Sequence, residues 1–356
     1  MQVDLIETYG LKGEKHEIKT SGGYIIQVFR IPNKDPKAPT VLLQHGLMVT
    51  SDIFVFTNMS LAIALAKDGN DVWLGNARGN VYSRANDKLS VDDQKFWDFS
   101  WHEMGTQDLP DIIDYIVKTA DKHKIDYVGH SMGSTMFFVM ASERPEYNDK
   151  IDNMVALAPV VYCNKYQFII TKGSSMHKMA EDTFRKFEEN KKWEAFPRND
   201  IQSNGHQLGC DDLPEMAVAF CKSGLEVSAS AILNLALVPG ISLLTTIYFS
   251  HFITGKIGKF DYGSAMENQK MYKSDSPPDY NMKNVKIPVH IFYAESDQLI
   301  DSTDIDSLAK DLPNVALKMQ MPNENFNHID FVYRSSDEIA QDYETLLAKI
   351  KEIVKK

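Results

Sequence analysis

Residues 124–136 read Lys-Ile-Asp-Tyr-Val-Gly-His-Ser-Met-Gly-Ser-Thr-Met, a short apolar strand that runs directly into a Gly-x-Ser-x-Gly turn. This pattern places a serine on a sharp strand-to-helix bend, in a backbone conformation too crowded for most residues that carry a side chain. Glycines two positions before and after Ser131 remove the Cβ atoms that would collide across the bend. The helix that follows, expected over Ser134 to Ser142, points its N-terminal amides at the same place. The stretch therefore predicts that Ser131 is a nucleophile.

Length and composition are those of an ordinary globular protein with room for a large core. The chain has 356 residues, of which 43% are hydrophobic and 24% charged. Its formal net charge of −11 argues against nucleic-acid binding, because no basic stripe is present to neutralise phosphates. The N-terminus shows no basic segment followed by an apolar run, so we expect either a cytosolic chain or a trimmed form of a secreted one.

Strands and helices alternate through the first part of the chain. Strands are expected at 41–45, 71–74, 125–128 and 154–158, helices at 60–67 and 108–120, and a hairpin over 16–31. Such alternation predicts an α/β fold with a mostly parallel sheet that is covered on both faces.

The alternation stops after Pro159 and resumes as strand character at 287–293. The intervening sequence is helical, locally charged and irregular. We therefore expect a core made of residues 1–160 and 285–356, interrupted by an inserted, mainly helical cap domain of residues 161–284. Within the cap, the apolar stretch 232–253 contains Asn, Pro-Gly and His residues, which favours two short buried segments over a transmembrane span. An interfacial or pocket-lining role for this stretch stays open.

A serine nucleophile needs a general base, and the base needs an acid to orient it. In folds with this serine turn the chain order is Ser, then Asp or Glu, then His, each after a strand. His328 follows the expected strand 316–321 and precedes the last helix, so it is our candidate base. Asp297 follows strand 289–293 and is the candidate acid, with Glu295 and Asp301 as alternatives that spacing does not exclude.

The tetrahedral intermediate of acyl transfer carries an oxyanion, which needs preorganised donors. One candidate is the backbone N–H of Met132, directly after the nucleophile, and the other is the N–H of Leu47, in the loop Gln44-His45-Gly46-Leu47. Because the backbone donates, the side chains at these positions are free to vary. We expect His45 to support the turn and not to act as a base.

No metal or cofactor is expected. His102-Glu103 lacks a second histidine four residues after the first, and the chain has no Cys/His cluster, phosphate loop or GxGxxG motif. Of the three cysteines, Cys210 and Cys221 are close enough in sequence to staple one loop, which would leave Cys163 free. Three buried thiols in a reducing compartment are the alternative, and the residues alone do not decide.

Further motifs occur in a fixed order along nearly the whole chain, and together they resemble the acid lipases, the family of gastric and lysosomal lipases with its insect members. They are His45-Gly46-Leu47, Asp71 to Asn80, Phe96-Trp-Asp-Phe-Ser100, Gly129 to Gly133, Gly258 to Gly263 and Asn327-His-Ile-Asp-Phe331.

The resemblance implies an α/β-hydrolase fold with a cap over an acyl-binding cleft. It implies Ser131 as nucleophile, Asp297 as acid, His328 as base, and Leu47 and Met132 as oxyanion donors. It also implies a cap disulfide between Cys210 and Cys221, a glycan at Asn58 in the chain's one sequon, and a secreted or lysosomal location.

The sequence departs from the family where Met132 replaces a frequent glutamine, in the residues before Asp297, which lack a glycine-rich approach, and throughout the cap.

These observations predict a serine ester hydrolase that acts on neutral lipids such as acylglycerols or steryl esters, without a cofactor. The substrate is expected at a lipid–water interface, because Trp193 and the stretch 232–253 make the cap apolar, although both are equally compatible with ordinary cap core. A carboxylesterase for short, soluble esters is the alternative, and a non-catalytic lipid carrier on the same fold is a third hypothesis. Nothing in the sequence indicates the oligomeric state.

Overall fold

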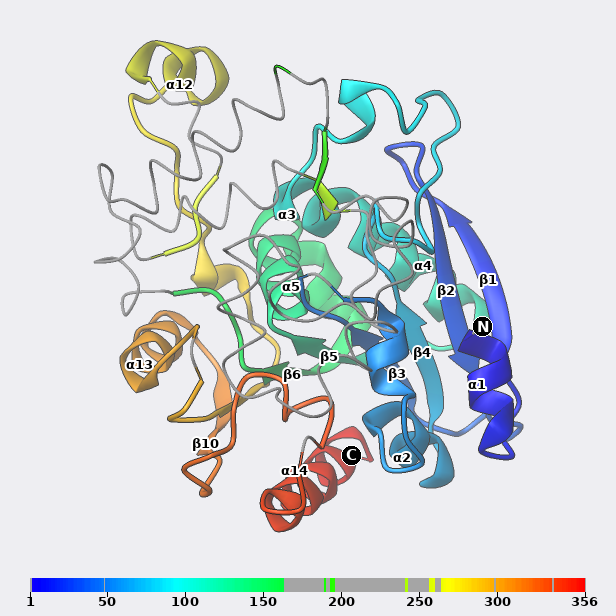
Figure 1. Cartoon of the computed structure of the whole chain (residues 1–356). Helices are drawn as coiled ribbons and strands as arrows, with labels where there is room; N and C mark the ends of the chain where they lie inside the picture. The colour runs from blue at the N-terminus through cyan, green and yellow to red at the C-terminus, as the bar shows by residue number, and fades with distance from the viewer. Residues whose placement is uncertain are drawn as a thin grey trace.

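The structure is a computed structural model. It describes residues 2–47, 49–162, 189, 193–195, 241–242, 256–259, 264–297, 299–334 and 336–355 (Figure 1). Most of the expected cap, including Cys163, Cys210 and Cys221, lies outside these residues, as does nearly all of the apolar stretch 232–253.

An eight-stranded sheet forms the centre of the described structure, in the order β1-β2-β4-β3-β5-β6-β9-β10. The first two pairings, β1 with β2 and β2 with β4, are antiparallel, and all the others are parallel. The expected mostly parallel sheet is therefore confirmed. The strands are β1 (Glu14–Lys19), β2 (Ile25–Ile31), β3 (Thr40–Gln44), β4 (Asp71–Gly75), β5 (Ile125–His130), β6 (Ile151–Leu157), β9 (Val289–Tyr293) and β10 (Val315–Gln320). A separate pair joins β7 (Glu194–Ala195) to β8 (Ile241–Ser242).

The burial of each strand follows its place in the sheet. All residues of the central strands β3, β4 and β5 are buried, which is why these segments are mostly apolar and show no alternation, with Asp71 and Asp126 as buried acidic exceptions. The edge strand β10 instead alternates between half-buried and exposed side chains. A sheet whose central strands are apolar on both faces needs helices above and below it.

Two groups of helices cover the sheet. In one group α4 and α5 contact each other, α4 contacts β1 and α5 contacts β5; in the other, α14 contacts α2 and β6 (Figure 1). The helices are α1 (Gln2–Thr8), α2 (Leu61–Lys67), α3 (Trp101–Glu103), α4 (Leu109–Thr119), α5 (Met132–Glu143), α12 (Ala265–Tyr272), α13 (Ser302–Asp311) and α14 (Ala340–Val354). A π-helical turn, Met104–Asp108, precedes α4, and 3₁₀ turns occupy Ser51–Phe54, Gln94–Phe96, Pro145–Lys150 and Met282–Asn284. Among the described residues, no helix combines the length and apolarity needed to cross a membrane.

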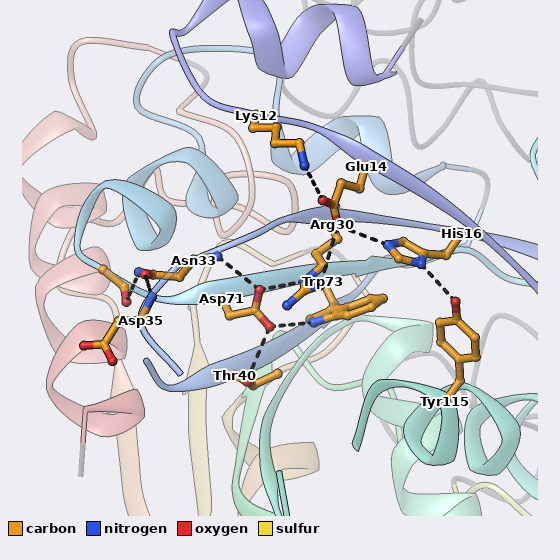
Figure 2. Close-up of polar contacts among 11 residues, drawn as sticks. Lys12, Glu14, His16, Arg30, Asn33, Asp35, Thr40, Asp71, Trp73 and Tyr115 are labelled. Carbon is orange, nitrogen blue, oxygen red and sulfur yellow. Dashed lines mark hydrogen bonds and ion pairs between the residues drawn. The ribbon is translucent and has the colours of Figure 1, made fainter. Parts of the chain in front are cut away.

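A polar cluster fastens the antiparallel hairpin to the rest of the sheet (Figure 2). The Arg30 Nε on β2 donates to Asp71 Oδ1 on β4 at 2.8 Å, and the Trp73 Nε1 donates to the other carboxylate oxygen at 2.9 Å. The Arg30 guanidinium also lies over the Trp73 ring, 4.8 Å from its centroid. His16 on β1 bonds the hydroxyl of Tyr115 on α4 at 3.0 Å, so helix and hairpin are tied together.

The chain leaves the core and returns to it at neighbouring points. Tyr162 and Lys256 form an antiparallel bridge, and the Ile257 N–H donates to the carbonyl of Val161 at 2.9 Å. The Lys256 ammonium lies 3.2 Å from a carboxylate oxygen of Asp311, at the end of α13. The outgoing and incoming segments therefore lie side by side against the core.

Candidate active site

Ser131 lies between β5 and α5, on the bend expected from the sequence. Its backbone has φ 53° and ψ −120°, a conformation that residues with a Cβ seldom adopt. The backbone holds it there, because the Ser131 N–H donates to the carbonyl of Leu157 on β6 at 2.9 Å and its own carbonyl accepts from Ser134 at 2.9 Å. The serine side chain is thus projected from a strained turn at the start of a helix.

The two glycines of the turn are required for different reasons. A Cβ on Gly129 would lie 2.7 Å from the backbone nitrogen of Ser134, which is the collision across the bend expected from the sequence. A Cβ on Gly133 would instead overlap the backbone carbonyl of Gln44, on the neighbouring strand β3. Gly133 therefore allows α5 to approach the end of β3, where the Gln44-to-Leu47 loop begins.

His328 and Asp297 form a hydrogen-bonded pair, with Nδ1 2.7 Å from Oδ2. Asp297 is fully buried, and its other oxygen accepts the backbone N–H groups of Leu299 at 2.8 Å and Ile300 at 3.3 Å. Both carboxylate oxygens of Asp297 thus act as hydrogen-bond acceptors. The proton of the pair therefore sits on Nδ1 of His328, which leaves the Nε2 lone pair to act as a base.

The two alternative acids have other places in the structure. Glu295 is exposed on the turn after β9. Asp301 caps helix α13, where its Oδ1 accepts the backbone N–H groups of Thr303 at 2.9 Å and Asp304 at 3.1 Å. Asp297 is thus the acid that the structure joins to His328.

His130 connects the serine turn to the loop of His328. Its Nε2 lies 2.8 Å from the backbone carbonyl oxygen of His328, to which it donates, and the two rings are 4.9 Å apart between centroids. Burial lowers the pKa of His130 well below its ordinary value, so the ring stays neutral. The residue next to the nucleophile therefore holds the backbone of the candidate base, a role that the sequence analysis did not foresee.

The third segment of the site is the loop after β3. A Cβ built on Gly46 would lie 2.9 Å from Cβ and 3.4 Å from Oγ of Ser131, so this loop passes directly beside the nucleophile. Leu47 follows in the chain and packs on the core, and Met132 is buried at the first position of α5. The described backbone hydrogen bonds include none from the N–H of Leu47 or Met132. Both N–H groups belong to segments that meet at Ser131, as oxyanion donors would require.

The predicted glycosylation site and the predicted disulfide cysteines differ in whether the structure describes them. Asn58 is exposed, in the loop before α2, whereas Cys210 and Cys221 lie outside the described residues. Within the part of the chain that the structure describes, no three His, Cys, Asp or Glu side chains are grouped so as to hold a metal ion.

Comparison with known families agrees with this architecture. Residues 39–332 match the model of the alpha/beta hydrolase fold, and residues 2–58 match that of a partial alpha/beta-hydrolase lipase region. The chain belongs to the acid lipase family of α/β-hydrolases. Lipase 1 of Drosophila melanogaster is 36% identical to it over 350 residues, which cover 92% of this chain and 75% of that protein. Gastric triacylglycerol lipase of Bos taurus is 31% identical over 362 residues, with 98% and 91% covered.

Solved structures with much lower identity share the fold of this acid lipase family member. The esterase EaEST from Exiguobacterium antarcticum matches with a TM-score of 0.51 at 13% identity, covering 95% of this chain and all of that one. The esterase RhEst1 from Rhodococcus sp. ECU1013 matches with a TM-score of 0.51 at 12% identity, covering 96% and 98%. At such identities the likeness establishes the fold alone.

Proposed function

We propose that this chain is a serine hydrolase that cleaves acyl esters of neutral lipids, acylglycerols or steryl esters, through an acyl-enzyme intermediate. The observation that carries the proposal is the buried Asp297–His328 pair, tied through His130 to a serine on a strained turn. Relatives from insects and mammals are named as lipases, and those from stomach as triacylglycerol lipases. The proposed ester chemistry thus rests on the residues of the site, and the proposed lipid class rests on the named relatives.

In the proposed reaction Ser131 Oγ attacks the ester carbonyl while Nε2 of His328 removes its proton. Asp297 accepts the Nδ1–H of His328 and stabilises the imidazolium that forms, and its burial strengthens this interaction. His328 then gives the proton to the leaving alcohol, and the acyl group remains on Ser131. In the second half of the reaction, water takes the place of the alcohol, attacks the acyl-enzyme with the help of His328, and releases the fatty acid.

The oxyanion that forms in each step would accept hydrogen bonds from the N–H groups of Leu47 and Met132. Each donor of this kind contributes about 10²- to 10³-fold to kcat in serine hydrolases. The Gly46 backbone passes close beside Ser131. This supports Leu47 as a donor, because the Leu47 N–H belongs to the same peptide unit as the Gly46 carbonyl.

We further propose that residues 161–284 form a cap inserted into the core formed by residues 1–160 and 285–356. The side-by-side exit and return at Tyr162 and Lys256 support this division, because an insert can be added there without disturbing the sheet. Trp193 is half-buried and packs on the core, which is compatible with a cap that lies over the site. We propose a substrate at a lipid–water interface. This predicts a jump in rate above the solubility limit of the ester, and a rate that saturates smoothly through that limit would contradict it.

The same proposal includes a secreted or lysosomal location, a disulfide between Cys210 and Cys221, and a glycan on Asn58. The exposed position of Asn58 supports the last of these.

The test is hydrolysis of p-nitrophenyl esters with acyl chains from two to sixteen carbons, comparing the wild type with Ser131→Ala. A rate that rises toward long chains and is lost in the variant is the expected result. Ser307→Ala, which removes a serine hydroxyl on α13, is the matched control and should keep full activity. A short-chain optimum would favour the carboxylesterase, and no hydrolysis by the wild type would favour the lipid carrier.

A further inference from the structure

His45 is a buried histidine next to the proposed oxyanion loop, and each of its ring nitrogens is engaged. Nδ1 lies 2.7 Å from the carbonyl oxygen of Gly46. Nε2 lies 3.1 Å from the backbone nitrogen of Ala77 and 3.2 Å from Nδ2 of Asn80. The side chain is 1% exposed, so water does not compete for these positions.

The partners of His45 determine its tautomer. A backbone N–H can only donate, so Nε2 must accept from Ala77, and the single proton of the neutral ring sits on Nδ1. Nδ1–H then donates to the Gly46 carbonyl, which can only accept. Burial lowers the pKa of His45 to about 4, and the ring therefore stays neutral in this tautomer near neutral pH.

The Gly46 carbonyl and the Leu47 N–H belong to one peptide unit. The structure has no cis peptide bond among its described residues, so the two groups point in opposite directions from a planar, trans unit. A hydrogen bond that fixes the carbonyl on one side therefore fixes the N–H on the other. Glycine leaves this peptide free to rotate, because Gly46 has no Cβ to restrict it. A contact from outside the loop is therefore needed to hold the Gly46–Leu47 peptide in one orientation.

The ring of His45 is itself held by a buried network of amides. Asn80 Nδ2 also lies 3.0 Å from Oδ1 of Asn76, which accepts the backbone N–H of Ser51 at 3.1 Å. Asn76 Nδ2 donates to the Ser51 hydroxyl at 2.9 Å and to the carbonyl of Gln27 at 3.0 Å. These contacts connect the ends of β3 and β4 to the 3₁₀ turn at Ser51 and to β2, and a network satisfied in this way is rigid.

We propose that His45 is a positioning residue for catalysis, whose Nδ1–H holds the Gly46 carbonyl so that the Leu47 N–H faces the oxyanion formed at Ser131. This inference rests on the proposed function, because it assigns the orientation of one of its oxyanion donors. The oxyanion exists in the transition state and not in the bound ester. Loss of the hydrogen bond from His45 to the Gly46 carbonyl therefore lowers kcat and leaves KM nearly unchanged.

Two substitutions of His45 separate its two contacts. In His45→Asn the side-chain amide reaches the position of Nδ1 and keeps a donor for the Gly46 carbonyl. In His45→Gln the amide reaches the position of Nε2 and the donor at Nδ1 is lost. We expect kcat to fall about 10²-fold in His45→Gln, with KM within about twofold of the wild type, and to recover at least partly in His45→Asn. Active-site titration and thermal melting normalise each rate to folded enzyme.

A second readout responds to the oxyanion and not to folding. A trifluoromethyl ketone forms a hemiketal oxyanion with the nucleophile, so its affinity should fall in His45→Gln in parallel with kcat/KM. If His45→Gln does not fold, Asn80→Ala takes its place, since it removes one support of the ring and should lower kcat severalfold at constant KM.

The outcomes distinguish this inference from the function on which it rests. Hydrolysis that occurs in the wild type and is absent in Ser131→Ala would support the proposed function. Equal kcat in wild type, His45→Gln and His45→Asn would then overturn the role of His45 alone. Equal losses in the two His45 variants, with inhibitor affinity unchanged, would also overturn it and assign His45 to structure only.

Discussion

Replacing Asp126 with asparagine should stabilise the protein at pH 8 far more than at pH 5. Asp126 lies on β5 and is 6% exposed, and its Oδ1 accepts from Nδ2 of Asn153 at 2.9 Å. Asn153 in turn bonds His290 on β9 at 3.2 Å. Burial, aided by the nearby charge of Asp152, raises the pKa of Asp126 to about 7 from 3.8, despite the hydrogen bonds from Asn153.

The sign follows from proton uptake. Between the pKa of the unfolded chain and that of the folded protein, only the folded state binds the proton. Stability is therefore lost as the pH rises from about 4 to about 7. One pKa unit corresponds to about 1.4 kcal/mol, so ionising Asp126 costs the folded state about 4 kcal/mol in total. About 3 kcal/mol of this falls between pH 5 and pH 8, where asparagine carries no such cost.

The assay is urea unfolding of wild type and Asp126→Asn at pH 5 and pH 8. The gain in unfolding free energy of the variant over the wild type should be larger at pH 8 by about 3 kcal/mol. Asp149→Asn, which removes an exposed carboxylate on the 3₁₀ turn before β6, is the control, and its unfolding free energy should differ from the wild type by well under 1 kcal/mol at both pH values. A difference between wild type and Asp126→Asn that is the same at both pH values would refute the reasoning.

Three further substitutions test the site and its supports. Asp297→Asn should lower kcat about 10⁴-fold with the fold intact, because an amide no longer holds the Nδ1–H tautomer of His328; a loss under tenfold in steady-state kinetics would contradict this. His130→Leu leaves the His328 carbonyl without its donor, at a cost of about 1–3 kcal/mol, and should lower both the melting temperature and kcat. His130→Gln, which restores a donor, should recover both, and equal behaviour of the two variants would argue against the contact. Gly133→Ala should destabilise the protein by more than about 2 kcal/mol in chemical unfolding, because its Cβ meets backbone, whereas Gly258→Ala has ordinary contacts and should be nearly neutral.

The strands and helices nearest Ser131 were predictable because their signals are local. β3 carries the apolar run 41–43, β5 is apolar apart from Asp126 and His130, and α4 shows buried isoleucines at helical spacing, so each element was expected within two or three residues of its true bounds. Helix α5 begins at Met132 and not at Ser134. Gly133, a poor helix former, lies inside the helix because the adjacent strand leaves no room for a Cβ.

The features that were not predictable depend on contacts between distant segments. The π-helical turn before α4 has no periodic signal, and it lies where Gly105 packs against the backbone of Met136 on α5. Spacing could not choose among Glu295, Asp297 and Asp301, because the choice depends on the path of the loop after β9. The bond from His130 to His328 spans 198 residues, and only the folded sheet brings its ends together.

The bridge between Tyr162 and Lys256 has a consequence for how such enzymes diversify. The 93 residues between these two anchors form a closed loop, and the entropy of closing a loop grows only with the logarithm of its length. Replacing them by a linker of about five residues would change that entropy term by only about 2–3 kcal/mol. Segments of very different length and composition can therefore be exchanged at this point while Ser131, Asp297 and His328 remain on the same scaffold. Under the core-and-cap division proposed above, substrate choice would then be a separable trait, open to change by exchanging this segment between lipases.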